Sequence, residues 1–257
     1  MSLEAFVLQG KAALVIGASN AIGRACALAL AEAGAEVTVT TTLTSKQEEA
    51  ALNLCLAELH ALSRKGFAQQ LDTTNANEVD AVVQRTVMEL GRLDILVNAQ
   101  DLPYAKPVRE MTPDEWRRVL DVNLTGPALA CRAAYGPMLT QGKGRVINVI
   151  SLLGERGITN GSAYCAAQAG VLNLTRALAL EWARSGVTIN AIGAGWTEGM
   201  GMIADEALKL QLARYIPQRR LAQPEEVASA AVYLASDSTG FITGQVIWID
   251  GGVRSRL

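Results

Sequence analysis

The sequence predicts one α/β domain built on a doubly wound parallel sheet with helices on both faces. Short apolar segments alternate along the chain with longer amphipathic ones, the pattern of strands joined by crossover helices. Most of the short segments are too apolar for a sheet that faces water on one side. A chain of 257 residues can bury one large core and does not require a second one. We therefore expect a single domain over residues 1–257.

Seven strands are predicted, at 12–16, 35–41, 67–71, 93–97, 144–150, 187–192 and 245–249. Helices are predicted near 21–33, 46–65, 77–90, 113–139, 162–184 and 225–235, several opened by a capping signal at Asn77, Thr112–Pro113 or Pro224. Right-handed crossovers would make the strands parallel.

The segment at about 193–216 interrupts the alternation before the last strand. It begins with a run rich in glycine, methionine and threonine and continues into a helical pattern at 203–214. We expect a mobile lid here, because long connections of this kind often cover a site. Its apolar residues either face a ligand or only pack against the domain: Trp196, Met200, Met202 and Ile203.

Composition excludes several classes of function. The net charge of −2 and the pI of about 5.6 predict no attraction to nucleic acid or to an anionic membrane. One histidine and four scattered cysteines predict neither a metal site nor a disulfide framework. No leader-like start and no run of 18 apolar residues are found, so we expect a cytoplasmic protein.

A glycine-containing turn follows the first predicted strand. The run Ile16-Gly17-Ala18-Ser19-Asn20-Ala21-Ile22-Gly23 places backbone N–H groups at a helix N-terminus, where a pyrophosphate binds well. The candidate phosphate-binding residues are Gly17, Ser19, Asn20, Ile22 and Gly23. A tight strand-to-helix turn without a ligand is the alternative.

Together with this turn, Ser151 and Tyr164-Cys-Ala-Ala-Gln168 make the chain resemble the short-chain dehydrogenase/reductases, closest to the 3-oxoacyl carrier-protein reductase type. The resemblance runs from about residue 8 to 252 and includes the tail segments Arg220–Ala228 and Asp250–Gly252. It implies a Rossmann-like fold and a reaction between a carbonyl and a secondary alcohol. It also implies catalytic roles for Ser151, Tyr164, Asn123 and the residue at 168, which in the family is a lysine.

The resemblance further implies a nicotinamide dinucleotide, NADP(H) or NAD(H). Thr41 stands where NAD-dependent members carry an acid, which favours NADP(H). Asp72 matches the aspartate beside the adenine, although an exposed turn cap is equally consistent. The other residues implied to contact the cofactor are Asn98, Ala99, Gly195 and Thr197.

Departures from the family pattern gather where the cofactor should lie: Ile16, Ala21, Gln100, Asp101, Gln168, Ala194 and Gly199. Losing a cation roughly 5 Å from the phenolate, at an effective dielectric constant of about 20, removes about 3 kcal/mol and raises the pKa of Tyr164 by about 2. We expect Asp101 to lie close to the cofactor phosphates and to weaken binding, and the Gln100 side chain to take up space there.

Three functions remain open from the sequence. The chain is an impaired or atypical oxidoreductase, a non-catalytic subunit that pairs with an active homologue, or a cofactor-independent enzyme using Ser151 and Tyr164. The substrate is a small carbonyl or acyl compound that the sequence does not identify further. Alanine-rich faces within 113–139, together with the resemblance, predict a homotetramer.

Overall fold

The computed structural model describes residues 6–41, 45–203 and 205–255. Its seven strands form one parallel sheet in the order β3-β2-β1-β4-β5-β6-β7. They are β1 (Ala12–Ile16), β2 (Glu36–Thr41), β3 (Ala68–Gln70), β4 (Ile95–Asn98), β5 (Gly144–Ser151), β6 (Val187–Ala194) and β7 (Val246–Ile249). The prediction of a single-domain, seven-stranded Rossmann-like sheet is confirmed.

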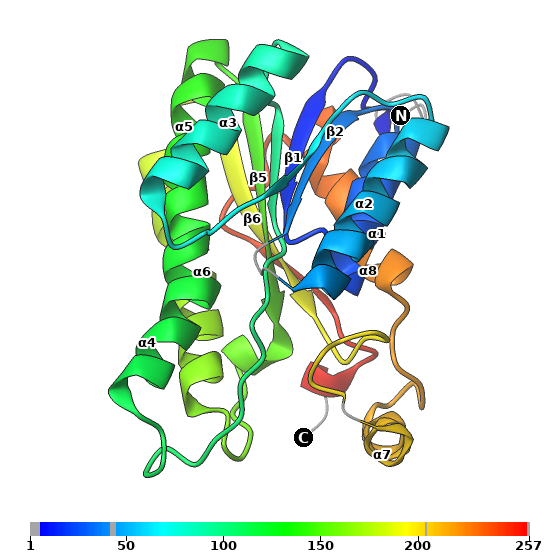
Figure 1. Cartoon of the computed structure of the whole chain (residues 1–257), viewed down its shortest axis with the longest axis vertical. Coiled ribbons are helices and arrows are strands. Elements are labelled where there is room, and N and C mark those ends of the chain that lie inside the picture. Colours follow the sequence, from blue (N-terminus) through cyan, green and yellow to red (C-terminus); the bar gives the residue numbers. More distant parts are fainter. Residues whose placement is uncertain (1–5, 42–44, 204, 256–257) are drawn as a thin grey trace.

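Helices cover both faces of the sheet (Figure 1). One face carries α1 (Ala21–Glu32), α2 (Lys46–Ala61) and α8 (Pro224–Ala235), and the other carries α3 (Ala76–Leu90), α5 (Gly126–Gln141) and α6 (Ser162–Glu181). Two shorter helices, α4 (Pro113–Leu120) and α7 (Glu206–Tyr215), lie beyond the carboxyl ends of the strands (Figure 1). Within the described part of the chain, no helix is long and apolar enough to cross a membrane.

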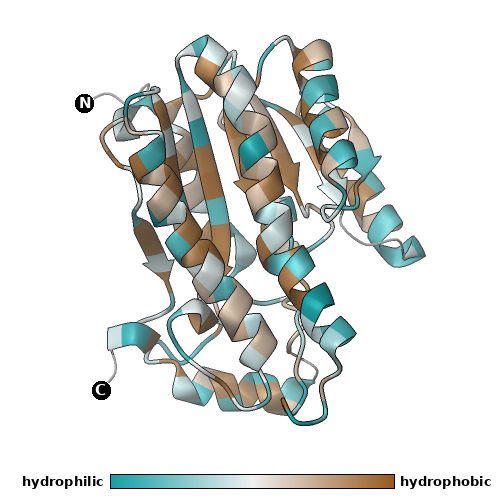
Figure 2. Cartoon of the chain, turned by 90° about the vertical axis from the view of Figure 1, so that its left-hand side faces the viewer, coloured by the Kyte–Doolittle hydropathy of each residue, from teal (hydrophilic) through white to brown (hydrophobic). Residues whose placement is uncertain are grey.

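Apolar strands bury their side chains in both layers. All five residues of β1 are buried, and they alternate between the core beneath α1 and α8 and the core beneath α3 and α5. In Figure 2 the strands are largely brown, whereas the helices that cover them carry both teal and brown residues. This two-sided burial is why the strands read as continuous apolar runs in the sequence.

The helix predicted over 113–139 is interrupted. After α4 the chain forms a π-helical turn, η2 (Asp121–Thr125), before α5 begins. Pro127, in the first turn of α5, has no N–H for an α-helical bond to Asn123, and the N–H of Gly126 instead reaches back five residues to the carbonyl of Asp121. The proline therefore explains the widened turn.

Two further helix boundaries differ from the prediction. Helix α2 ends at Ala61 and not at 65, because Ser63 has a left-handed backbone conformation (φ 59°) that ends the helix. Helix α3 is capped by Asn75, whose side chain accepts from the N–H of Asn77, so Asn77 itself is not the cap. The predicted cap at Thr112 is confirmed by a capping box with Glu115. Pro224 is the first residue of α8, and the residue before it, Gln223, is the N-cap, whose N–H donates to Glu226.

The strand order reverses between β1 and β4. Chain segments leaving these two strands run in opposite directions along the sheet, so their loops separate and leave a crevice at the carboxyl edge.

Candidate functional site

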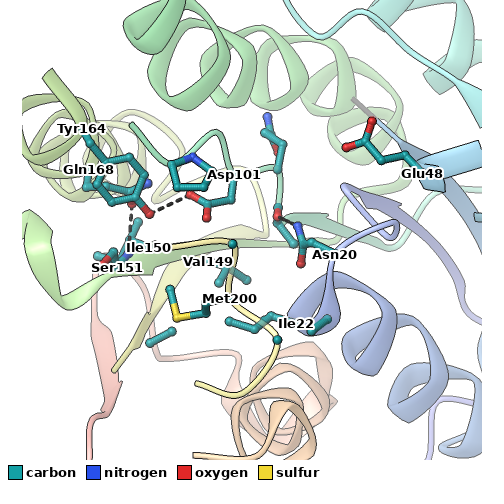
Figure 3. Close-up of a pocket in the computed structure, with 17 residues that line it drawn as sticks. Asn20, Ile22, Glu48, Asp101, Val149, Ile150, Ser151, Tyr164, Gln168 and Met200 are labelled. Carbon is teal, nitrogen blue, oxygen red and sulfur yellow. Dashed lines mark hydrogen bonds between the residues drawn. The ribbon is translucent and has the colours of Figure 1, made fainter. Parts of the chain in front are cut away.

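A cavity of about 250 Å³ fills this crevice. It extends from the first turn of α1 to the N-terminal part of α6 (Figure 3). Six of the residues expected to be functional line it: Asn20, Ile22, Ala99, Ser151, Tyr164 and Gln168. The other expected residues do not line it: Gly17, Ser19, Gly23, Thr41, Asp72, Asn98, Asn123, Gly195 and Thr197.

The turn between β1 and α1 forms one end of the cavity. Asn20 caps α1 by accepting from the N–H of Gly23 at 2.9 Å, and its amide donates to the carbonyl of Ala99 at 2.7 Å. The first turn of α1 contains no acidic residue, so the positive end of the helix dipole is not neutralised by the helix itself. This end of the cavity suits a phosphate group.

Close packing accounts for both glycines of the turn. A Cβ at Gly23 would come within 2.2 Å of the Gly17 carbonyl oxygen, and one at Gly17 would meet the backbone of Gln100 at 2.6 Å. The two glycines are therefore explained by packing and are not evidence for a ligand. The features that suit a ligand are the N-terminus of α1 and the cavity.

Ala21, which stands where the family pattern has glycine, is matched by a second departure. Its Cβ would lie 2.8 Å from a Cβ at Gly199, a residue with φ of 76°. The extra methyl group at position 21 therefore occupies space that a side chain at position 199 would need. The sequence shows two unrelated substitutions, whereas the structure shows that they are neighbours.

Two residues expected near the adenosine have partners within the protein. The Thr41 hydroxyl donates to the Ser19 hydroxyl at 2.7 Å, and Thr42 lies outside the described residues. Asp72 accepts from the N–H and the hydroxyl of Thr74, as expected for an exposed turn cap. Glu48, from the first turn of α2, lines this end of the cavity and was not anticipated.

At the end of β4, two amide side chains turn into the protein. Asn98 donates to Asn148 at 2.8 Å within a buried network that continues to Thr175. Gln100 is only 5% exposed, and neither its Nε2 nor its Oε1 has a hydrogen-bond partner among the described residues. Its Nε2 would lie 3.3 Å from a Cβ at Gly126, so the amide packs against the start of α5, while Gln100 also lines the cavity.

Asp101 occupies the opposite end of the cavity from the one predicted. Its carboxylate accepts a hydrogen bond from the Tyr164 hydroxyl at 2.7 Å (Figure 3). The expectation that it lies close to the phosphates is therefore wrong: the chain after β4 directs it towards α6. No other observation changes the chemistry of the site as much.

Burial raises the affinity of both groups for protons, and Asp101 raises that of Tyr164 further. Burial raises the pKa of Asp101, and the hydrogen bond from Tyr164 partly opposes this. Burial also raises the pKa of Tyr164 well above its usual value, and the negative charge of Asp101 raises it further, while the Ser151 hydroxyl acts in the opposite direction. A phenol in this setting keeps its proton at neutral pH.

Gln168 carries no charge that could stabilise the phenolate, and its side chain is engaged elsewhere. Its Oε1 accepts from the backbone N–H of Ser151 at 2.9 Å, linking α6 to the end of β5 (Figure 3). The Ser151 hydroxyl accepts from the N–H of Leu153 at 3.2 Å. Gln168 thus fixes the backbone that carries the serine.

Asn123 lies in the π-helical turn with its side chain occupied. It accepts from the N–H of Leu102 at 2.9 Å and donates to the carbonyl groups of Leu102 and Val119. The Asn123 side chain therefore forms hydrogen bonds within the protein and does not line the cavity. It holds the residue that follows Asp101.

After β6, the segment expected to contact the nicotinamide is packed within the protein. The Thr197 hydroxyl donates to the Gly195 carbonyl at 3.1 Å, and a Cβ at Gly195 would meet Asp250 at 2.6 Å. Of the four apolar lid residues only Met200 lines the cavity; Trp196, Met202 and Ile203 pack against the core around Tyr164. Residue 204 lies outside the described chain.

No group of histidine, cysteine or acidic side chains that could hold a metal ion occurs among the residues with described positions.

Comparisons with known proteins agree with this architecture. A family model described as Enoyl-(Acyl carrier protein) reductase matches residues 17–254. A 3-oxoacyl-[acyl-carrier-protein] reductase of Synechocystis sp. is 38% identical over 248 residues, which cover 96% of this chain and 98% of that protein. A cis-4-hydroxycyclohexanecarboxylate dehydrogenase of Sinomonas cyclohexanicum is 38% identical, covering 94% of this chain and 96% of that one.

Among solved structures, a gluconate 5-dehydrogenase from Burkholderia cenocepacia in complex with NADP and tartrate superposes with a TM-score of 0.91 at 29% identity, and the match covers 100% of both chains. A doubly wound parallel sheet binds dinucleotides in the crevice where its strand order reverses. The chain belongs to the short-chain dehydrogenase/reductase family.

Proposed function

We propose that this protein is an NAD(P)(H)-dependent oxidoreductase that interconverts a carbonyl compound and a secondary alcohol, with NADP(H) preferred. The observation that carries the proposal is the single cavity that joins the unneutralised N-terminus of α1 to the Tyr164 hydroxyl. A dinucleotide needs a phosphate site and a reaction centre joined in this way.

The residues present fit the dinucleotide. Backbone N–H groups at Ala21 and Ile22 would face its pyrophosphate, and the ring that donates or accepts hydride would lie towards Ser151 and Tyr164. Bound there, the cofactor supplies the hydride chemistry. The relative with NADP bound and the lack of an acid at Thr41 support the preference for NADP(H).

The protein's own residues then supply position and a proton. The Tyr164 phenol, which keeps its proton at neutral pH, donates to the carbonyl oxygen, and the Ser151 hydroxyl helps to orient that oxygen. Met200, from the 193–216 segment, lines the cavity and would act as part of a lid over it.

A non-catalytic subunit, paired with an active homologue, is the second candidate. It is favoured by the absence of any lysine or arginine from the described lining, so that Gln168 has no cationic replacement. Both functions are compatible with assembly into a tetramer, which we propose from the family resemblance.

Titrations of the purified protein with NADPH and with NADH, followed by calorimetry, test the proposal together with turnover on a 3-oxoacyl thioester and a cyclic ketone. Saturable binding with turnover supports an oxidoreductase. Binding without turnover on any carbonyl supports the non-catalytic subunit, and no binding of either nucleotide contradicts the proposed function.

A further inference from the structure

The Asp101 carboxylate is an ionisable group in direct contact with the Tyr164 hydroxyl, the proton-exchanging group of the proposed reaction. It lies 2.7 Å from the Tyr164 hydroxyl oxygen, lines the same cavity, and comes from the loop after β4, whereas Tyr164 comes from α6. Family membership does not assign this residue a role.

We propose that Asp101 and Tyr164 form a proton-transfer couple in which the Asp101 carboxyl group supplies and takes back the proton that Tyr164 exchanges with the substrate. This inference rests on the proposed oxidoreductase function. It accounts for how a site without a lysine at position 168 can still move a proton.

The proton balance in reduction is complete. The substrate carbonyl carbon receives a hydride from a reduced nicotinamide, and its oxygen takes the phenolic proton of Tyr164. The O–H bond of the Asp101 carboxyl group then breaks, and its proton moves to the phenolate oxygen, leaving a carboxylate that accepts a hydrogen bond from Tyr164, as observed. In alcohol oxidation every transfer runs in reverse, and the carboxylate is the base.

The couple solves a specific problem of the isolated phenol. A phenol with a raised pKa gives up its proton reluctantly and is almost never present as the base at neutral pH. A carboxyl group whose pKa is raised from the usual acidic range titrates closer to neutrality. The doubly protonated pair can therefore release one proton and end as a stable anion with the charge on Asp101.

The charged and titratable groups around the couple are few. Helix α6 contributes Tyr164 and Cys165, α2 contributes Glu48 at the far end of the cavity, and β5 contributes the uncharged Ser151. No lysine, arginine or histidine is among the described residues of the lining, so nothing cationic there holds Asp101 ionised. Asp101 is partly exposed, so its carboxyl group can exchange protons with solvent.

The first test does not require a cofactor. Tyrosinate absorbance is titrated in the wild type and in Asp101→Asn, each with and without Tyr164→Phe, so that the difference isolates Tyr164. Asparagine keeps the shape and a hydrogen-bond acceptor but removes the charge, so Tyr164 should ionise about one pH unit lower or more in Asp101→Asn. Asp114→Asn, which removes an exposed carboxylate from the first turn of α4, should leave the titration unchanged.

The second test is the pH dependence of carbonyl reduction. Wild type and Asp114→Asn should lose activity with rising pH through one ionisation, that of the couple, and Asp101→Asn should shift this loss to higher pH or be inactive throughout. An unshifted Tyr164 titration, or the same high-pH loss in wild type and Asp101→Asn, overturns the couple. If the wild type binds neither NADPH nor NADH, the proposed oxidoreductase function fails, and the titration alone still decides whether the two groups are coupled.

Discussion

Replacing Gln100 with methionine should make the protein more stable. The two residues have nearly the same length and volume, so the substitution mainly removes the amide atoms Nε2 and Oε1, which are buried without partners. An unsatisfied buried polar group costs about 1–3 kcal/mol. At about 2–4 °C per kcal/mol for a chain of this size, Gln100→Met should raise the Tm by about 2–12 °C.

Gln168→Met is the matched control. Gln168 is also buried in the lining of the same cavity, at 4% exposure against 5% for Gln100, but its Oε1 accepts from the N–H of Ser151. The same substitution here leaves that N–H unpaired, so it should lower the free energy of unfolding by about 1–3 kcal/mol. Opposite signs at two similar sites separate hydrogen bonding from a general effect of methionine.

Differential scanning calorimetry and urea unfolding measure both variants. Equal destabilisation by Gln100→Met and Gln168→Met would refute the reasoning, because it would mean that the Gln100 amide is hydrogen-bonded in solution. A calorimetric titration of Gln100→Met with NADPH adds a second result: weaker binding, with higher stability of the free protein, would assign the amide to the cofactor.

Three other outcomes are expected. Asp101→Asn should change how stability depends on pH. Because the pKa of Asp101 is raised in the folded state, the wild type loses stability as pH rises through that pKa. Urea unfolding should therefore show Asp101→Asn to be more stable than the wild type at neutral pH and as stable as the wild type in acid. Gln168→Lys should lower the pKa of Tyr164 and move the pH optimum of NADPH oxidation to lower pH. A cation roughly 5 Å from the phenolate stabilises it by about 3 kcal/mol, which exceeds the about 1 kcal/mol lost with the Ser151 hydrogen bond. If wild type, Gln168→Lys and the double variant Gln168→Lys/Asp101→Gly all fold but are all inactive, the non-catalytic subunit is favoured. Glu48→Gln should strengthen NADPH binding several-fold more than NADH binding, because we expect the additional 2′-phosphate of NADPH to lie at the end of the cavity that Glu48 lines. Equal changes by calorimetry would mean that the 2′-phosphate does not lie near Glu48.

Strand positions could be predicted from the sequence because they depend on local patterns. The residues of β1 are apolar throughout since both faces of the sheet are covered, and Gly23 of the following turn is required by a contact with Gly17 six residues earlier. The serine and tyrosine of the site were likewise found from their spacing.

Asp101 could not be placed in the same way. Its side-chain direction depends on the hydrogen bonds between Asn123 and Leu102, which join segments 21 residues apart. The contact of Ala21 with Gly199 and the burial of the Gln100 amide against Gly126 are also long-range. Each departure from the family pattern was visible in the sequence, but what it touches was not.

The π-helical turn Asp121–Thr125 sets the rotation of α5 about its axis relative to α4. Each α-helical residue advances by about 100°, so one extra residue in a turn changes which side of the following helix faces inwards. Val119 of α4 packs in the core around Tyr164, while Ala130, Ala134 and Met138 of α5 face the core of the sheet. Deleting one residue from the turn would leave only one of these two faces correctly aligned. The register between the helix that packs at the reaction centre and the helix that packs on the sheet is thus set by a single residue.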